Sequence, residues 1–199
     1  MSQNLSPSWV YFPRLLLLVI GSAFFITSVA CGESSGGSEG GFDVTEKSIQ
    51  ELNSALESGL VTSEELVNLY YERIEAFDRR GPVLNSVITL NANALSDAAR
   101  LDEERFNGDV RGPLHGIPVL VKDNYDTFDM PTTAGTLGLA TSVPPDDAFQ
   151  VHRLRQAGAV ILGKTNMHEL ARGITTVSSL TGQTRNPYDP SLSLIHISE

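Results

Sequence analysis

The sequence Gly-Pro-Leu-His-Gly-Ile-Pro-Val-Leu-Val-Lys-Asp-Asn, residues 112–124, joins a turn rich in glycine and proline to a short apolar segment that ends in a lysine. An uninterrupted apolar run such as 119–121 is typical of a strand that is buried on both faces. Lys122 ends this strand, so we expect its ammonium group to be partly removed from water. Desolvation lowers the pKa of a lysine, because burial penalises the charged form, and a neutral lysine is a base. Lys122 is therefore our candidate catalytic residue, and the alternative from this run alone is a surface lysine whose stem is buried.

Two helix starts precede this strand. Ser48 with Glu51, and Thr62 with Glu65, have the spacing of capping boxes, in which the two side chains bond the free backbone N–H groups at the start of a helix. Apolar residues recur at helical spacing after each box, and the second pattern continues to position 77. We expect two helices that pair as a hairpin.

The rest of the chain alternates between strand and helix patterns. Residues 87–90 favour a strand and residues 93–106 favour a third helix. After a loop rich in threonine and glycine, Asp146 or Asp147 is placed to cap a fourth helix, and a strand is expected at 160–162. Repeated alternation of helix and strand predicts an α/β fold.

Five motifs, in order along residues 45–191, together resemble the amidase signature family of serine amidohydrolases. The resemblance implies a mixed central sheet flanked by helices on both faces, present here only in part. The motifs are Arg-Gly-Pro-Leu-His-Gly-Ile-Pro at 111–118, Lys-Asp-Asn at 122–124, Ala-Gly-Ala-Val at 157–160, Gly-Lys-Thr-Asn-Met-His-Glu at 163–169 and Gly-Gln-Thr-Arg-Asn-Pro-Tyr-Asp-Pro at 182–190.

The resemblance also implies a catalytic triad of two serines and a lysine, and Lys122 matches the lysine. In this mechanism the lysine takes a proton through a bridging serine in a cis peptide, while the second serine attacks the amide carbonyl. Both serines follow the Asn-Pro-Tyr-Asp-Pro motif in the family, so we expect them beyond Pro190. Asp123 and Asn124 either orient the lysine or only shape the turn.

Residues 192–199, Leu-Ser-Leu-Ile-His-Ile-Ser-Glu, do not continue the family pattern and contain no glycine. They resemble the translated read-through of a sequencing-library adapter, so we expect a foreign tail here. Ser193 and Ser198 are for that reason not assigned the roles of the two serines. We expect residues 45–191 to be the amino-terminal part of an amidase signature domain, without hydrolytic activity by itself.

The amino terminus has the pattern of an export signal. Arg14 precedes the apolar stretch 15–29, which is short for a membrane span and suits a signal peptide. The ending at Cys31 resembles a bacterial lipoprotein cleavage site, in which the cysteine becomes the lipidated first residue. The alternatives are an ordinary signal with an incidental cysteine, or an uncleaved anchor. Residues 32–44, rich in glycine and serine, are expected to be a flexible linker. The chain is thus expected in the bacterial cell envelope, anchored in the periplasm or on the cell surface.

Composition argues against several other classes of function. The net charge is −10, with 14 Lys and Arg against 24 Asp and Glu, so a nucleic-acid-binding surface is not expected. The four histidines have no metal-ligand spacing. Gly158 with Gly163-Lys164-Thr165 has the spacing of a phosphate-binding loop, but residues 159–162 favour a strand, which cannot turn its amides toward one anion. The resemblance likewise implies no cofactor.

These observations predict a longer, exported amidase that hydrolyses the C–N bond of a small-molecule carboxamide through an acyl-serine intermediate. The same signature occurs in amidotransferase subunits that release ammonia from glutamine for transfer-RNA charging, but an export signal argues against that cytosolic work. A noncatalytic surface lipoprotein is the third alternative. Membrane contact is expected only through the amino terminus, and the pattern indicates no particular oligomeric state.

Overall fold

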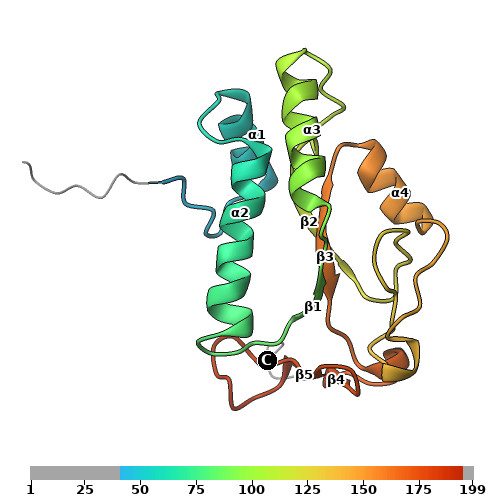
Figure 1. Ribbon diagram of the computed structural model, residues 1–199. Coiled ribbons are helices and arrows are strands. Elements are labelled where there is room, and N and C mark those ends of the chain that lie inside the picture. Colours follow the sequence, from blue (N-terminus) through green and yellow to red (C-terminus); the bar gives the residue numbers. More distant parts are fainter. Residues whose placement is uncertain (1–40, 195–199) are drawn as a thin grey trace, which may run out of the picture. The chain divides into compact units, whose positions relative to one another are not determined.

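A three-stranded mixed sheet forms the centre of the structure (Figure 1). Its strands are β1 (Val87–Leu90), β2 (Pro118–Lys122) and β3 (Val160–Thr165), in the order β1-β3-β2. Strand β3 runs antiparallel to β1 and parallel to β2, so the sheet is mixed as predicted. The long connection between β2 and β3 contains a helix, which makes a β-α-β crossover.

The computed structural model describes residues 41–194. The signal peptide predicted at 1–31, all of the predicted linker before residue 41, and residues 195–199 of the predicted tail lie outside this range. No helix in the described range is long and apolar enough to cross a membrane.

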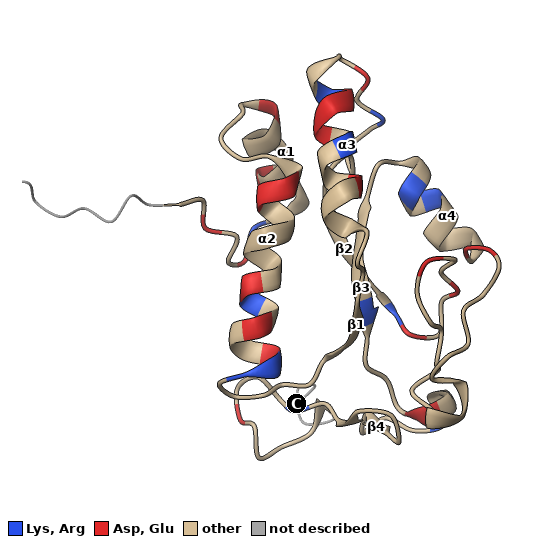
Figure 2. Ribbon diagram, viewed as in Figure 1, with Lys and Arg blue, Asp and Glu red and all other residues tan. Residues whose placement is uncertain are grey.

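Helices cover both faces of the sheet (Figure 1). On one side lie α1 (Ile49–Glu57), α2 (Ser63–Arg73) and α3 (Ala94–Phe106), and on the other lies α4 (Phe149–Gln156). Figure 2 shows that most charged residues lie on the helices and loops, and few on the strands. The predicted α/β class with helices on both faces is confirmed for this part of the fold.

Strand β3 supplies the core on both sides of the sheet. Val160 and Leu162 pack with α2 and α3, whereas Ile161 packs with Val151 of α4. This division follows from the period of a strand, whose successive side chains point to opposite faces. With a neighbour at each edge and helices on each face, β3 is the buried strand of the sheet.

Strand β2 differs from the prediction of a strand buried on both faces. It pairs only with β3 in the described part of the chain, and of its five side chains only Val121 is buried. Leu120 remains 37% exposed. The apolar run correctly predicted a strand, but a run of this length does not distinguish an edge strand from a central one.

Both predicted capping boxes are present. The amide of Ser48 donates to Glu51 Oε2 at 2.8 Å, and the amide of Glu51 donates to Ser48 Oγ at 3.3 Å. The equivalent distances at Thr62 and Glu65 are 2.8 and 3.1 Å. The two helices share one apolar core, as expected for paired helices. The second helical pattern, predicted to continue to position 77, forms α2 as far as Arg73 and then a π-helix over Ile74–Arg79.

The predicted cap of α4 is wrong. The residue before α4 is Ala148, and neither aspartate caps the helix with its side chain. Asp147 instead accepts a hydrogen bond from the amide of Phe128 at 3.2 Å and lies 3.0 Å from Arg155 Nε. The carboxylate therefore joins the loop to α4 rather than starting the helix.

Four short elements complete the described part. Two are 3₁₀-helices, at Leu137–Leu139 and Glu169–Ala171. The other two are the strands β4 (Val177–Ser178) and β5 (Gly182–Gln183), which form a two-stranded antiparallel sheet. The second 3₁₀-helix follows β3, and its connection to β4 returns the chain toward the loop that precedes α4.

Replacing Gly158 by alanine should destabilise the fold more than the same change at Gly59. Both glycines have positive φ, 85° and 70°, so each substitution carries backbone strain of about 1–2 kcal/mol. A Cβ at Gly158 would also lie 2.8 Å from the backbone Cα of His115, whereas Gly59 faces open space. We expect Gly158→Ala to cost about 1–3 kcal/mol more in urea unfolding. Equal losses would show that this close approach is not a constraint.

Candidate active site at the end of the sheet

Lys122 lies at the carboxyl end of β2, where the chain turns away from the sheet. Its carbonyl accepts a hydrogen bond from the amide of Tyr125 at 2.9 Å, which closes the turn. Its side chain is exposed, whereas the sequence predicted partial removal from water. The difference arises because β2 is an edge strand within residues 41–194.

The side chain of Lys122 belongs to the face of the sheet that α2 and α3 cover. Residues two apart on a strand share a face, so Lys122 lies on the same face as Leu120. Leu120 lines a groove of about 380 Å³ between the sheet and the end of α2. The exposed amine of Lys122 thus lies on the same sheet face as a largely apolar groove. Besides Leu120, the groove is lined by Tyr70, Arg73, Ile74, Phe77, Asp78, Pro82, Leu84, Ser86, Leu162 and Pro187.

Asp123 points to the opposite face and is fully buried. Its carboxylate accepts hydrogen bonds from the amide of Thr133 at 3.3 Å, from the hydroxyl of the same residue, and from the amide of Gly135 at 3.2 Å. Its own amide donates to the carbonyl of Thr165 at 3.2 Å. These bonds hold the loop that follows β2. Asn124 is exposed.

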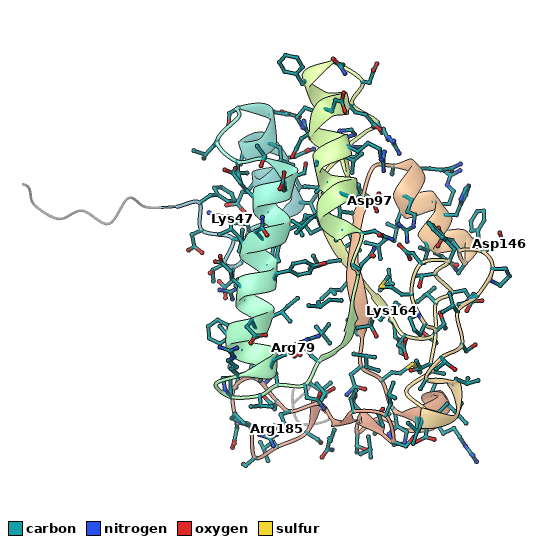
Figure 3. All side chains as sticks on the ribbon, in the orientation of Figure 1. Lys47, Arg79, Asp97, Asp146, Lys164 and Arg185 are labelled. Carbon is teal, nitrogen blue, oxygen red and sulfur yellow. The ribbon has the colours of Figure 1, made fainter. Side chains whose placement is uncertain are left out.

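Lys164 is the lysine that the structure buries. Its side chain is completely buried on β3, inside the molecule (Figure 3). The ammonium group donates to Thr132 Oγ1 at 2.9 Å, to the carbonyl of Pro131 at 3.2 Å and to Thr127 Oγ1 at 3.4 Å. It also lies 3.6 Å from Asp123 Oδ1. Oxygen atoms thus surround the buried charge.

Burial lowers the pKa of Lys164, because removal from water disfavours the ammonium form. The nearby carboxylate of Asp123 opposes this shift, and those of Asp126 and Asp129 oppose it less. Burial has the larger effect, so the net direction is downward.

In the sequence, Lys164 belongs both to the family motif at 163–169 and to the phosphate-binding spacing that starts at Gly158, and neither pattern assigned it a role. The strand predicted at 160–162 is present and extends through Thr165, so Gly163 and Lys164 are extended strand residues. A lysine close to the end of an apolar strand pattern is the available signal, with Gly163 between the pattern and Lys164, and a similar signal selected Lys122. The order of the strands, which the pattern does not contain, decides which of the two is buried.

The histidines within residues 41–194 have separate surroundings, and His196 lies outside this range. His115 is buried, with Nε2 2.8 Å from the carbonyl of Leu101 and Nδ1 accepting from the amide of Arg111 at 3.2 Å. His152 is exposed, and His168 contacts a threonine hydroxyl. Within residues 41–194, no three His, Cys, Asp or Glu side chains are grouped so that they could hold a metal ion.

The remaining residues considered from the sequence lie apart from this arrangement or outside the described range. Ser193, at the start of the predicted tail, forms an isolated antiparallel bridge with Arg185. Ser198 and Cys31 are outside the described residues. The structure thus brings Lys122, Asp123 and Lys164 together at one end of two paired strands, with the two lysines on opposite faces.

Comparison with known proteins identifies relatives over most of the described region. A family model described as Amidase matches residues 65–194. A glutamyl-tRNA(Gln) amidotransferase subunit of Azoarcus sp. is 44% identical over 142 residues, which are 71% of this chain and 28% of that protein.

Two solved structures superpose on most of this chain. The peptide amidase of Stenotrophomonas maltophilia is 47% identical and superposes with a TM-score of 0.71, covering 74% of this chain and 31% of the other. An amidase family protein of Bacillus anthracis is 40% identical, with a TM-score of 0.69, over 74% and 30% of the two chains. The chain therefore spans less than a third of the length of these relatives. Because the family model covers well over half of it, the chain belongs to the amidase signature family.

Proposed function

We propose that this chain is the amino-terminal part of an amidase that hydrolyses carboxamide C–N bonds through an acyl-serine intermediate. The observation that carries the proposal is the position of Lys122, an exposed amine that ends β2 inside the motif Lys-Asp-Asn and on the same sheet face as an apolar groove. The similarity to the peptide amidase of Stenotrophomonas maltophilia supports an amide as the substrate.

In this proposal Lys122 is the base that takes the proton of the nucleophile through a bridging serine. Both serines lie beyond Pro190 in the longer protein, and backbone amides near the nucleophile hold the oxyanion. Lys122 must be neutral to accept a proton. The proposal therefore requires further chain to cover the exposed end of β2, because removal from water lowers the pKa of a lysine. The described part alone is expected to be inactive.

A glutamine-hydrolysing amidotransferase subunit is the second candidate, favoured by the 44% identity to the Azoarcus protein. The apolar stretch 15–29 and Cys31 argue for the exported amidase, since transfer-RNA charging takes place in the cytosol. The substrate from which the longer protein releases ammonia distinguishes the two. Hydrolysis of glutamine only in the presence of partner subunits would favour the amidotransferase, and hydrolysis of peptide amides by the isolated protein would favour the amidase.

Export and lipid attachment at Cys31 are part of the same proposal. The segment 32–44 then acts as a tether between the membrane and the folded domain, and its content of glycine and serine suits that role.

Replacing Lys122 by alanine in the longer protein should abolish labelling by a fluorophosphonate probe, which reacts with an activated serine. Loss of a general base lowers such rates by about 10²- to 10⁴-fold. The matched control is Lys47→Ala. Lys47 is a surface residue far from β2 in the sequence, and its Nζ lies 3.4 Å from Glu51 Oε1. Labelling of the Lys122→Ala protein at the rate of the control would remove the lysine from the mechanism.

A second test concerns the amino terminus. When the chain is expressed in a bacterium fed with radiolabelled palmitate, label should appear on the protein and should be absent from a Cys31→Ser variant. Cys31 is the only cysteine, so no other thiol competes for the lipid. Equal label in both proteins, or none in either, would contradict lipid attachment at this residue.

A further inference from the structure

We propose that Lys164 is a positioning residue, which together with Asp123 fixes the loop after β2 and so sets the direction in which Lys122 leaves the sheet. The inference rests on the proposed function of Lys122. It assigns to the fully buried lysine a role in the same site, although the ammonium group of Lys164 lies on the other face of the sheet.

The contacts of Lys164 all reach one segment of chain. From the central strand, its ammonium group donates to the side chains of Thr127 and Thr132 and to the carbonyl of Pro131, and it faces the carboxylate of Asp123. The four partners belong to the start of the connection that links β2 to α4. A single side chain therefore ties residues 123–132 to the middle of the sheet.

Asp123 holds the same loop through its own hydrogen bonds. Its carboxylate accepts from the amides of Thr133 and Gly135, and its carbonyl accepts from the amide of Ala134 at 3.0 Å. Ala134 has a φ of 49°, a backbone conformation that a side chain disfavours and that the surrounding bonds must hold in place. The carbonyl of Gly135 in turn accepts from Ser178 Oγ at 2.7 Å.

A chain of hydrogen bonds leads from Lys164 to the backbone of Lys122. Lys164 donates to Thr132 Oγ1 at 2.9 Å, and that hydroxyl donates to the carbonyl of Tyr125 at 3.2 Å. The amide of Tyr125 donates to the carbonyl of Lys122 at 2.9 Å. Movement of the loop would therefore move the peptide group from which the side chain of Lys122 projects.

A charged residue is needed here because the loop carries buried acid. Asp123 is fully buried, and Asp126 and Asp129 also act on Lys164 through their charge. An apolar side chain in place of Lys164 would leave the carboxylate of Asp123 buried without a cation, which is strongly destabilising. Removing both charges together avoids that penalty, and it supplies a variant that can fold.

The pH dependence of stability tests the burial of Lys164 in the chain itself. Its pKa is lower in the folded chain than in the unfolded chain, so between that value and about 10.4 only the unfolded chain holds the proton. Stability should therefore rise with pH in this window through this residue. We expect the rise in the urea midpoint to be lost in the double variant Lys164→Met with Asp123→Asn and kept in Lys47→Met. The same pH dependence in the wild-type protein, the double variant and the Lys47→Met control would overturn the burial of a titrating lysine.

The positioning role is tested in the longer protein with a peptide amide as substrate. The double variant should lower kcat by up to about 100-fold through misplacement of Lys122, leave KM nearly unchanged, and shift the midpoint of the pH–rate profile. The amides of Thr133 and Gly135 should also exchange hydrogen faster than in the Lys47→Met control.

The outcomes separate the two proposals. If Lys122→Ala is inactive while the double variant has the kcat and pH midpoint of the control, the positioning role is overturned and the proposed function stands. If Lys122→Ala retains full activity, the proposed function itself fails. A folded double variant with reduced kcat and a shifted midpoint supports both.

Discussion

The ion pair between Lys164 and Asp123 lies out of contact with water, and the carboxyl ends of β2 and β3 depend on it. Both side chains are completely buried, and each also bonds to threonines of the loop that follows β2. Buried charges are costly unless they are paired and hydrogen-bonded, and loss of one partner typically costs about 3–5 kcal/mol. Both charges keep their hydrogen-bond partners only while the loop holds this conformation, so the ion pair and the loop depend on each other.

The period of a strand explains how one end of the sheet serves two purposes. Lys122 and Asp123 are adjacent, so their side chains leave opposite faces. The aspartate faces the loop on the α4 side, and the lysine faces the side of the groove beside α2. One face thus carries a buried polar network, while the other presents the exposed amine of Lys122.

Local features of the fold could be predicted from the sequence, and features that depend on strand order could not. The capping boxes at Ser48 and Thr62 and the strand at 87–90 follow from residues close to one another in the chain. The burial of Lys164 and the exposure of Lys122 depend on β3 being placed between β1 and β2, which no local pattern contains. The cap expected from Asp147 failed for a similar reason, because Arg155 and Phe128 supply tertiary partners for that carboxylate.

The order β1-β3-β2 also has a consequence for how the domain forms. The central strand is the last of the three in the sequence, so β1 and β2 leave the ribosome before the strand with which each must pair. Pairings between residues far apart in a chain slow folding, and unpaired strand edges invite association with other chains. Nascent β1 and β2 therefore remain without their neighbour until residues 160–165 have been synthesised, and protection by a chaperone would be most valuable during that interval.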